Sequence, residues 1–373
     1  MKDRMEKREE DHTENLKTGR AAKEKKKKKL PLWGKIVLGI AIALAALFIG
    51  GMIFINAKLN KINRVDPNDV SWLPREEETF EVDPPADTDG DGEADPTPTD
   101  TVSPEDITWE NVDVNVMQDK DVSNILLIGQ DARPGEGRAR SDSMIICSIN
   151  KKTKKITLSS IMRDLYVPIP GYSDNRINAA YQFGGMALLD QVIEESLGIH
   201  IDGNVEVNFD GFIGAFTEIG NLDIELYQAE ADHLNKQNSE WHLTEGVNSL
   251  TPEQALAYAR IRYVGHSDWE RTDRQRRVLM AAFTKLQGSD LGTMLNMADK
   301  IFPYLTTDMD NMQILGYVYT VVTSGMTLGE NYRIPVEGTY SCETLRAGME
   351  VLVPDLNANS RYLQEAIYGT AAE

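Results

Sequence analysis

The amino-acid sequence predicts an α/β protein in which a central β-sheet is flanked by helices on both sides, as α-β-α layers, with a single N-terminal transmembrane helix. Short apolar runs typical of buried strands are interleaved with segments of helical periodicity. A continuous apolar run long enough to cross a bilayer lies near the N-terminus. With 373 residues, 41% of them hydrophobic, the chain can also build a sizeable core beside its tails.

The N-terminal region predicts a membrane anchor with a cytoplasmic tail. Residues 1–35 form a basic tail so poor in apolar side chains that we expect it to be disordered. The apolar run covers residues 36–55, and the lysines at 25–29 precede it. Because basic residues stay on the cytoplasmic side, the rest of this single-pass protein is placed outside the cell membrane. A cleaved signal peptide is the alternative, but the run is long and no small-residue cleavage site follows it.

Residues 56–122 have the composition of an extracellular linker, acidic and rich in Pro and Asp. Within this segment, four aspartates have the spacing that begins a calcium-binding loop: Asp87, Asp89, Asp91 and Asp95. Pro98 stands where such a loop requires a bidentate Glu, so a solvated tether is favoured. The net charge of −20 gives no support for a nucleic-acid partner.

Residues 123–373 are predicted to form the extracellular domain, with core motifs in 124–286 and a C-terminal extension in 287–373. Three apolar runs predict neighbouring buried strands, and they cover 125–128, 143–149 and 156–161. A helix, a strand and a second helix follow at 178–197, 205–209 and 212–219, and Gly198 and Gly220 end the two helices. A last helix is expected near 357–368.

The two cysteines, Cys147 and Cys342, would both lie outside the membrane, where a disulfide is permitted. The apolar neighbours of Cys147 favour a buried thiol instead. No Cys or His pair has metal-ligand spacing, and no Ser, His and Asp set has a nucleophile-elbow context. Zinc hydrolases and serine hydrolases are therefore unsupported.

The segment 250–286 concentrates arginines in an otherwise acidic chain, and they are Arg260, Arg262, Arg271, Arg274, Arg276 and Arg277. Guanidinium groups bind phosphate through paired hydrogen bonds, so their spacing decides whether they converge. Thr251 and Pro252 predict the start of a short helix that ends near Arg260. In an extended run after it, Arg260 and Arg262 would share one face while Ile261 faces the core.

A second helix, capped by Asp268, is expected after Gly265, and it places Arg271, Arg274 and Gln275 on one stripe. Arg276 and Arg277 would point elsewhere, as exposed surface residues. Solvated, salt-bridged arginines are the ordinary interpretation of such a charge run, and this alternative stays open. The convergent spacing favours a binding site for an anion.

Charged side chains also meet at the ends of the predicted strands. Asp131 follows the first strand, Arg140 and Asp142 precede the second, and Arg163 follows the third. Adjacent strand ends hold the active sites of open α/β sheets. Arg176 opens the long helix, whose N-terminus favours anions. These groups are either plain ion pairs or a Mg²⁺ site in which the aspartates hold the metal and phosphates take its remaining positions.

In this order, the segments resemble the LytR-CpsA-Psr family of Gram-positive bacteria. The segments are GQDAR at 129–133, RSDSM at 140–144, SIMRD at 160–164, NRINAAYQFGG at 175–185, YARIRY at 258–263 and DWERTDRQ at 268–275. Each is weak alone, and their order is specific. Three positions depart from the family pattern, because GQD replaces Gly-small-Asp, Met162 stands where Pro is common and Arg176 stands where Lys is usual.

The resemblance implies a phosphotransferase that moves a secondary cell-wall polymer, such as teichoic acid, capsular or another anionic polysaccharide, from an undecaprenyl-pyrophosphate carrier to peptidoglycan. Asp131 and Asp142 would hold Mg²⁺, with Mn²⁺ as a substitute. The implied pyrophosphate-binding residues are Arg140, Arg163, Arg176, Arg260, Arg262, Arg271, Arg274 and Gln275. The implied catalytic residues are Asp131, Asp142, Arg163, Arg260, Arg262, Asp268 and Arg271, with Asp268 orienting an arginine or acting as the base.

An apolar tunnel for the lipid tail is expected along residues 178–216. Two alternatives remain: a non-catalytic receptor, scaffold or regulator that binds anionic lipid-linked glycans, and a polyprenyl-pyrophosphate hydrolase in which water replaces the acceptor. A receptor would retain the arginines and lose the metal-binding carboxylates, and both carboxylates are present. The polymer, the acceptor hydroxyl and the oligomeric state stay open.

Overall fold

The main β-sheet has seven strands in the part of the chain that the computed structural model describes, in the order β1-β10-β7-β2-β3-β4-β11. The described residues are 55–66, 101–109, 111–130, 139–262, 264, 268–345 and 348–370. All of them except Ile55 belong to one unit, Asn56–Glu373. The predicted membrane span at 36–55 thus lies, but for Ile55, outside the described residues, and no helix within them is long and apolar enough to cross a bilayer.

The centre of the sheet is an antiparallel meander of β2 (Val122–Gln130), β3 (Ser141–Asn150) and β4 (Lys155–Ile161). The three predicted buried strands are therefore confirmed, and each is longer than its apolar run. β7 (Gly203–Asn208) pairs in parallel with β2, and β11 (Thr327–Ile334) pairs in parallel with β4. The sheet is consequently mixed.

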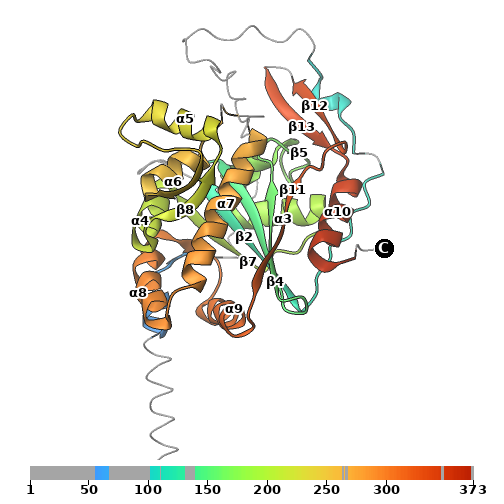
Figure 1. The fold of residues 1–373 in the computed structure, drawn as a ribbon. Coiled ribbons are helices and arrows are strands. Elements are labelled where there is room, and N and C mark those ends of the chain that lie inside the picture. The colour runs from blue at the N-terminus through green and yellow to red at the C-terminus, as the bar shows by residue number, and fades with distance from the viewer. Residues whose placement is uncertain are drawn as a thin grey trace, which may run out of the picture. The chain divides into compact units, whose positions relative to one another are not determined.

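Helices cover both faces of this sheet (Figure 1). On one face, α3 (Ile177–Leu197) and α10 (Leu356–Tyr368) pack with the strands into the largest apolar core. On the other face lie α7 (Asp268–Gln287) and α9 (Asn311–Thr323), which contribute Phe283 and Val321 to a second cluster. The predicted layered α/β fold is confirmed. Its predicted helices at 178–197 and 357–368 correspond to α3 and α10.

Beside the sheet, a smaller core joins α7 to a group of short elements. These are α4 (Phe209–Ile219), β8 (Leu222–Leu226), α5 (Gln228–Gln237), β9 (Gly246–Leu250) and α6 (Pro252–Ala259). α6 begins as predicted, because Thr251 accepts a hydrogen bond from the Gln254 amide in a capping box. The remaining elements are η1 (Pro104–Asp106), β5 (Tyr166–Val167), β6 (Asn175–Arg176), α8 (Leu291–Ile301), η2 (Phe302–Tyr304), β12 (Tyr340–Leu345) and β13 (Met349–Pro354).

Both ends of the predicted linker at 56–122 belong to the folded unit, so the linker is shorter than expected. β1 (Asn63–Arg64) pairs with β10 (Thr306–Thr307) at the edge of the main sheet. Trp109 donates to Asp174 Oδ2 at 2.6 Å and packs against the apolar core. Composition misled the prediction because a few apolar anchors stand among many acidic residues. The calcium-like aspartates at 87–95 lie outside the described residues.

Candidate active site

The start of β3 and the end of β4 bring Asp142 and Arg163 together, as the sequence predicts. Asp142 is the second residue of β3, and Arg163 lies two residues beyond β4. Since Met144 pairs with Ile161, the two side chains meet, and Arg163 Nη1 lies 2.9 Å from Asp142 Oδ1. Their side chains are 20% and 25% exposed, so the pair is partly screened from water but reachable from outside.

A second carboxylate links Arg163 to the start of α3. Asp164 lies between two guanidinium groups, with Oδ2 3.5 Å from Arg163 Nε and Oδ1 3.4 Å from Arg176 Nε. Arg176 also donates to the Glu350 carbonyl, 2.9 Å from its Nε. Arg176 is the residue before the first turn of α3, so a cation is fixed beside a helix N-terminus.

Helix α7 adds Arg271 and Gln275 to the same edge, and this part of the predicted stripe is present. Arg271 is only 3% exposed, and its Nη2 lies 3.4 Å from the carbonyl oxygen of Asp142. Ser143 Oγ donates to Gln275 Oε1 at 2.9 Å. The first residues of β3 thus contact Arg163 on one side and α7 on the other.

Arg274, the third member of the stripe, lies inside the domain. Its Nε donates to Glu230 Oε1 at 2.7 Å, and both side chains are 3% exposed. Its other two nitrogens donate to the carbonyl oxygens of Ile261, at 3.0 Å, and Val264, at 2.9 Å. The structure therefore does not bring Arg274 to the site. Instead, Arg274 fixes the segment that follows α6.

The connection at the end of α6 carries Arg260 and Arg262. Ile261 is 1% exposed and faces the core, as expected. The expected extended run is wrong, because Arg260 caps α6 with helical backbone angles (φ −99°, ψ −4°). Arg260 is exposed and Arg262 is half-buried. The bonds from Arg274 to the Ile261 and Val264 carbonyl groups hold this connection in place.

The expectation that Arg276 is an exposed surface residue is also wrong. It is 5% exposed and donates to Ser160 Oγ at 2.6 Å, because this side of α7 packs against β4. Burial lowers the pKa of Arg276 from its usual value. Arg277 points elsewhere, as predicted, but it is half-buried and not exposed, because it donates to the hydroxyl groups of Tyr258 and Tyr227 at 3.1 and 3.0 Å.

Arg140 extends the edge toward α3, where its Nε donates to Gln182 Oε1 at 3.2 Å. Beside it is a cluster that the sequence analysis missed. Gln130, the last residue of β2, and Tyr181 of α3 both donate to Glu206 of β7. The sequence signal for this cluster was Glu206, the single carboxylate among the alternating residues of β7.

A further cation at the edge, Arg333 of β11, was also missed. Arg333 is paired in register with Ser160, and its guanidinium group lies 4.3 Å from the ring centroid of Trp269. Burial lowers the pKa of Arg333 from its usual value. The sequence signal for this cation was the position of Arg333, near the end of a strand in the C-terminal extension.

The side chains of two predicted site residues lie outside the described part of the structure. Asp131, one residue beyond Gln130, lies outside the described residues, as does the side chain of Asp268, the first residue of α7. The chemistry of the expected metal ligands fits Mg²⁺, because Asp142 offers carboxylate oxygens at the site and Mg²⁺ takes few protein ligands. In the described part of the chain, no group of three or more His, Cys, Asp or Glu residues is placed to hold a metal.

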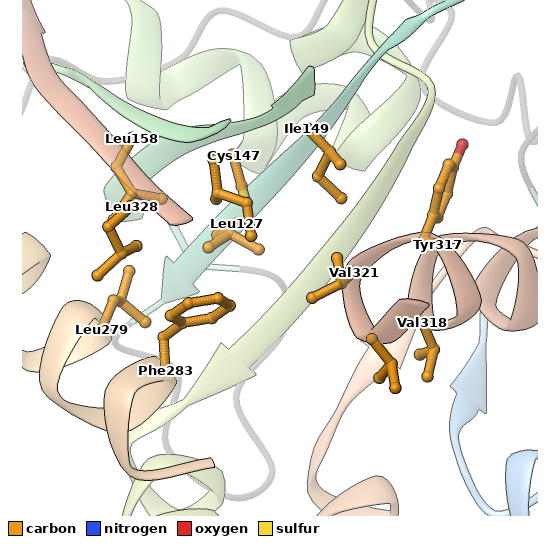
Figure 2. A pocket seen from close by; sticks show the side chains of 12 residues that line it. Leu127, Cys147, Ile149, Leu158, Leu279, Phe283, Tyr317, Val318, Val321 and Leu328 are labelled. Atoms are coloured by element: carbon orange, nitrogen blue, oxygen red, sulfur yellow. The ribbon is translucent and has the colours of Figure 1, made fainter. Parts of the chain in front are cut away.

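An apolar cavity of about 330 Å³ lies between the sheet, α7 and α9 (Figure 2). Its lining residues are Leu127, Cys147, Ile149, Ile156, Leu158, Leu279, Phe283, Tyr317, Val318, Val321, Val322 and Leu328. None of them falls in the expected tunnel segment 178–216, because α3 packs on the opposite face of the sheet. Cys147 and Cys342 are free thiols, and burial raises the pKa of Cys147 to about 12.

One face of α7 connects the charged edge to this cavity. Arg271, Gln275, Leu279 and Phe283 follow one another at intervals of four residues, so they lie along one side of the helix. The first two contact the start of β3, and the last two line the cavity. The site therefore combines cationic and apolar surfaces in line.

Comparisons with known proteins agree with this arrangement. The model of the LytR_cpsA_psr family matches residues 91–360. The polyisoprenyl-teichoic acid–peptidoglycan teichoic acid transferase TagT of Bacillus subtilis (strain 168) is 29% identical over 331 residues, which cover 80% of this chain and 90% of TagT. The structure of TagT bound to LI-WTA has a TM-score of 0.55 and 28% identity, and covers 66% of this chain and 91% of that chain.

A second TagT structure, with bound octaprenyl pyrophosphate lipid, has a TM-score of 0.52 and 25% identity over 66% of this chain and 91% of that chain. The family match includes the strands, the helices and the arginine-bearing segments that form the site described above. Because that match spans most of the folded unit, this chain belongs to the LytR-CpsA-Psr family.

Proposed function

We propose that this protein is a phosphotransferase that moves a cell-wall glycopolymer from a polyprenyl-pyrophosphate carrier to a hydroxyl group of peptidoglycan. The observation that carries the proposal is the face of α7, which leads from Arg271 at the charged edge to Phe283 in the apolar cavity. A carrier of this kind has the same two parts, an anionic head and an isoprenoid tail. Arginine suits the head, and an apolar pocket suits the tail.

The relatives support the choice of substrate. TagT is named a transferase of teichoic acid from a polyisoprenyl carrier to peptidoglycan, and it has been solved with lipid-linked and octaprenyl-pyrophosphate ligands. In this chain, undecaprenyl pyrophosphate is the proposed carrier. Teichoic acid or another anionic polysaccharide is the proposed polymer.

The proposed reaction breaks the phosphoanhydride bond of the pyrophosphate and forms a phosphodiester bond to the acceptor. The acceptor hydroxyl oxygen attacks the phosphorus that bears the polymer, and a new bond forms between them. The bond from that phosphorus to the bridging oxygen breaks, so the carrier leaves as polyprenyl monophosphate. The hydroxyl proton passes to a base, for which Asp268 is the proposed group.

The chain's own residues bind the pyrophosphate and stabilise its charge. Arg163 and Arg271 converge on Asp142 from two sides, and we assign them to the phosphate oxygens. Arg140, Arg176, Arg260, Arg262 and Gln275 complete the proposed binding set. Asp131 and Asp142 would hold Mg²⁺, which when bound neutralises charge on the pyrophosphate. Mn²⁺ is the proposed substitute.

The proposed location is the outer side of the cell membrane, with residues 36–55 as a single-pass anchor and residues 1–35 in the cytoplasm. An anchor of this kind keeps the site close to a lipid-linked substrate. The peptidoglycan acceptor is outside the same membrane.

Transfer can be tested with the full-length protein in vesicles that contain a lipid carrier bearing a radiolabelled polymer. With purified peptidoglycan and Mg²⁺, we expect the label to become covalently attached to peptidoglycan, and chelation to stop the reaction. Release of free labelled polymer would support the hydrolase instead. Carrier binding without turnover in either form would support the receptor.

Arg163→Ala is expected to lower transfer at least about a hundredfold, the typical loss for one charge-stabilising donor. Lys300→Ala is the matched control, because Lys300 is an exposed cation that pairs with Glu218 far from the edge in sequence and fold. Equal activity in the two variants would contradict the assignment of Arg163.

A further inference from the structure

Helix α9 carries an apolar face that is exposed to solvent. Its sequence, NMQILGYVYTVVT, has no charged residue in a chain whose net charge is −20. Met312, Val318, Tyr319 and Val322 are 66%, 52%, 70% and 53% exposed. At 100° per residue they lie within an arc of about 120°. A contiguous apolar patch that is exposed to solvent marks a contact surface.

The exposed face of α9 adjoins the apolar cavity. The opposite side of the helix packs on the sheet through Ile314, Tyr317 and Val321. Val318 and Val322 line the cavity although more than half of each is exposed. Figure 2 shows α9 at one side of the cavity, with Val318 and Val321 on neighbouring parts of the helix. The cavity therefore opens at the exposed face of α9.

The residues that directly follow the apolar run contact the start of α9. Asn311, the first residue of α9, donates through Nδ2 to the side-chain oxygens of Asn56 and Asn60, at 2.7 Å each. Lys58 and Lys61 pair with Asp299 of α8, at 2.6 Å each. Asn56 directly follows the run at 36–55. Covalent continuity thus brings the start of α9 close to the point where an anchored chain leaves the bilayer.

We propose that α9 lies in the interface of the membrane, with Met312, Val318, Tyr319 and Val322 among the headgroups and upper acyl chains. An apolar helical face binds at this depth, and tyrosine is enriched there. The mouth of the cavity then opens directly to the lipid phase. This inference rests on the membrane anchoring proposed above.

The arrangement assigns a path to the carrier lipid. Its isoprenoid tail leaves the bilayer at α9 and runs along α7 toward Arg271. Phe283 lies twelve positions beyond Arg271 on α7, which at a rise of 1.5 Å per residue gives about 18 Å. The pyrophosphate is therefore bound about that far along α7 from the part of the helix that lines the cavity.

The position of α9 can be measured by fluorescence quenching with the full-length protein in vesicles. A fluorophore is attached to one introduced cysteine in a Cys342→Ser background, in which Cys147 remains but reacts poorly because burial raises its pKa to about 12. The acyl chains of the lipid carry bromine, which quenches at short range. We expect a probe at Tyr319→Cys to be quenched. The matched control is Val247→Cys in β9, which is 73% exposed and is expected to remain bright.

A third probe separates this inference from the anchoring on which it rests. A probe at Ala45→Cys lies within the apolar run. If Ala45 is quenched and Tyr319 is not, the anchor stands and the role of α9 is overturned. If neither is quenched, the anchoring fails, and the inference fails with it. Shielding of Tyr319 that depends on protein concentration and not on the brominated lipid would identify a second copy of the chain, and would also overturn the inference.

Transfer provides an independent readout. The double variant Met312→Glu with Tyr319→Glu is expected to lose about tenfold or more in transfer from a carrier embedded in a bilayer, since each tenfold corresponds to about 1.4 kcal/mol. With a short-chain carrier dissolved in water, the same variant should match the unmodified protein. Val247→Glu with Tyr362→Glu, two exposed residues on other elements, is the control. Equal losses with both carriers would overturn the inference.

Discussion

At the scale of single residues, Arg271 and Arg274 show how two arginines of one helix acquire different roles. They lie three positions apart on α7, so their directions differ by about 60°. That rotation is enough to turn Arg271 toward β3 and Arg274 toward Glu230 of α5. The first contacts the edge at which the substrate would bind. The second completes a buried ion pair.

Arg271→Ala and Arg274→Ala are therefore expected to fail in different ways. The first should lower single-turnover transfer by at least about a hundredfold and leave the melting temperature nearly unchanged. The second leaves the buried carboxylate of Glu230 without its cation, which typically destabilises a protein by about 3–5 kcal/mol. Thermal melts and transfer assays on both variants separate the two effects.

The control for this comparison removes both charges. Arg274→Met combined with Glu230→Leu should recover much of the lost stability, because no buried charge then lacks a partner. An Arg274→Ala protein that melts like the unmodified one would show that the pair does not support the fold. A stable but inactive Arg274→Ala protein would return this residue to the substrate site.

Asp190 of α3 carries a prediction about pH. Burial raises its pKa well above 3.8, while a hydrogen bond from Asn204, at 2.7 Å, opposes this shift. Its Oδ1 is buried and has no hydrogen-bond partner within the described residues. The folded protein therefore holds a proton that the unfolded chain releases. The contribution of Asp190 to stability falls as the pH rises above about 3.8 toward the folded-state pKa.

Asp190→Asn keeps the shape and removes the titration. We compare the free energy of unfolding of this variant with that of the unmodified protein by denaturant titrations at several pH values. The value for the variant minus the value for the unmodified protein is expected to increase as the pH rises above about 3.8. Asp223→Asn, at an exposed strand position, is the control for removing one carboxylate from the surface of the domain. A difference for Asp190→Asn that stays constant with pH would contradict the raised pKa of Asp190.

At the scale of elements, α7 unites the two halves of the proposed substrate site. Its first turns contact β3, and its later turns line the apolar cavity. No single loop supplies both surfaces. The sequence separation between Leu127, Leu279 and Val321 explains why the cavity could not be predicted, since it exists only once β2, α7 and α9 are packed together.

Filling the cavity should selectively weaken the use of long carriers. Leu279→Trp puts a larger side chain into the space proposed for the tail, and we expect KM for an undecaprenyl carrier to rise about tenfold, which corresponds to about 1.4 kcal/mol. A carrier with a very short tail should be used as before. Transfer is measured as a function of carrier concentration for both tails.

The matched control is Thr284→Trp, which adds the same side chain to an exposed position of the same helix and should leave both KM values unchanged. Overpacking typically costs about 1–3 kcal/mol of stability, so melting curves accompany the kinetics. If Leu279→Trp raised KM equally for both carriers, the cavity would not hold the tail.

At the scale of the whole molecule, much of the fold could be predicted, because the spacing of apolar residues and the residues that end a helix or strand are local features of the sequence. The apolar runs of β2, β3 and β4 and the glycines after α3 and α4 mark these elements within a few residues. The meeting of Asp142 with Arg163 follows from strands that end at a common edge. Helical spacing also placed Arg271 and Gln275 on a shared face.

What could not be predicted depends on neighbours distant in the sequence. Spacing gives the direction of a side chain around α7 but not the element that packs there, so the burial of Arg274 and Arg276 was missed. Arg333 and Glu206 reach the edge only through pairing of β11 with β4 and β7 with β2. Composition described 56–122 as linker, although a few apolar side chains anchor both ends.

The proposed membrane topology predicts a labelling pattern in intact cells. In a Cys342→Ser background, a cysteine at Thr99 should react with a membrane-impermeant maleimide, and a cysteine at Thr18 should react only after lysis. Cys147 contributes little signal, because burial raises its pKa to about 12 and thiolate is the reactive form. The reverse pattern would place the domain in the cytoplasm.

The pairing of β1 with β10 changes what the acidic stretch does. Residues 56–66 and 101–109 both belong to the folded domain, so the segment 67–100 is joined to one domain at both of its ends. A segment joined in this way does not connect the domain to the anchor, so under the proposed anchoring its contour length would not set the distance from the charged edge to the bilayer. Doubling the length of a loop costs only about 0.6 kcal/mol. Insertions in 67–100 would therefore cost little stability and would leave the proposed height of the charged edge above the membrane unchanged.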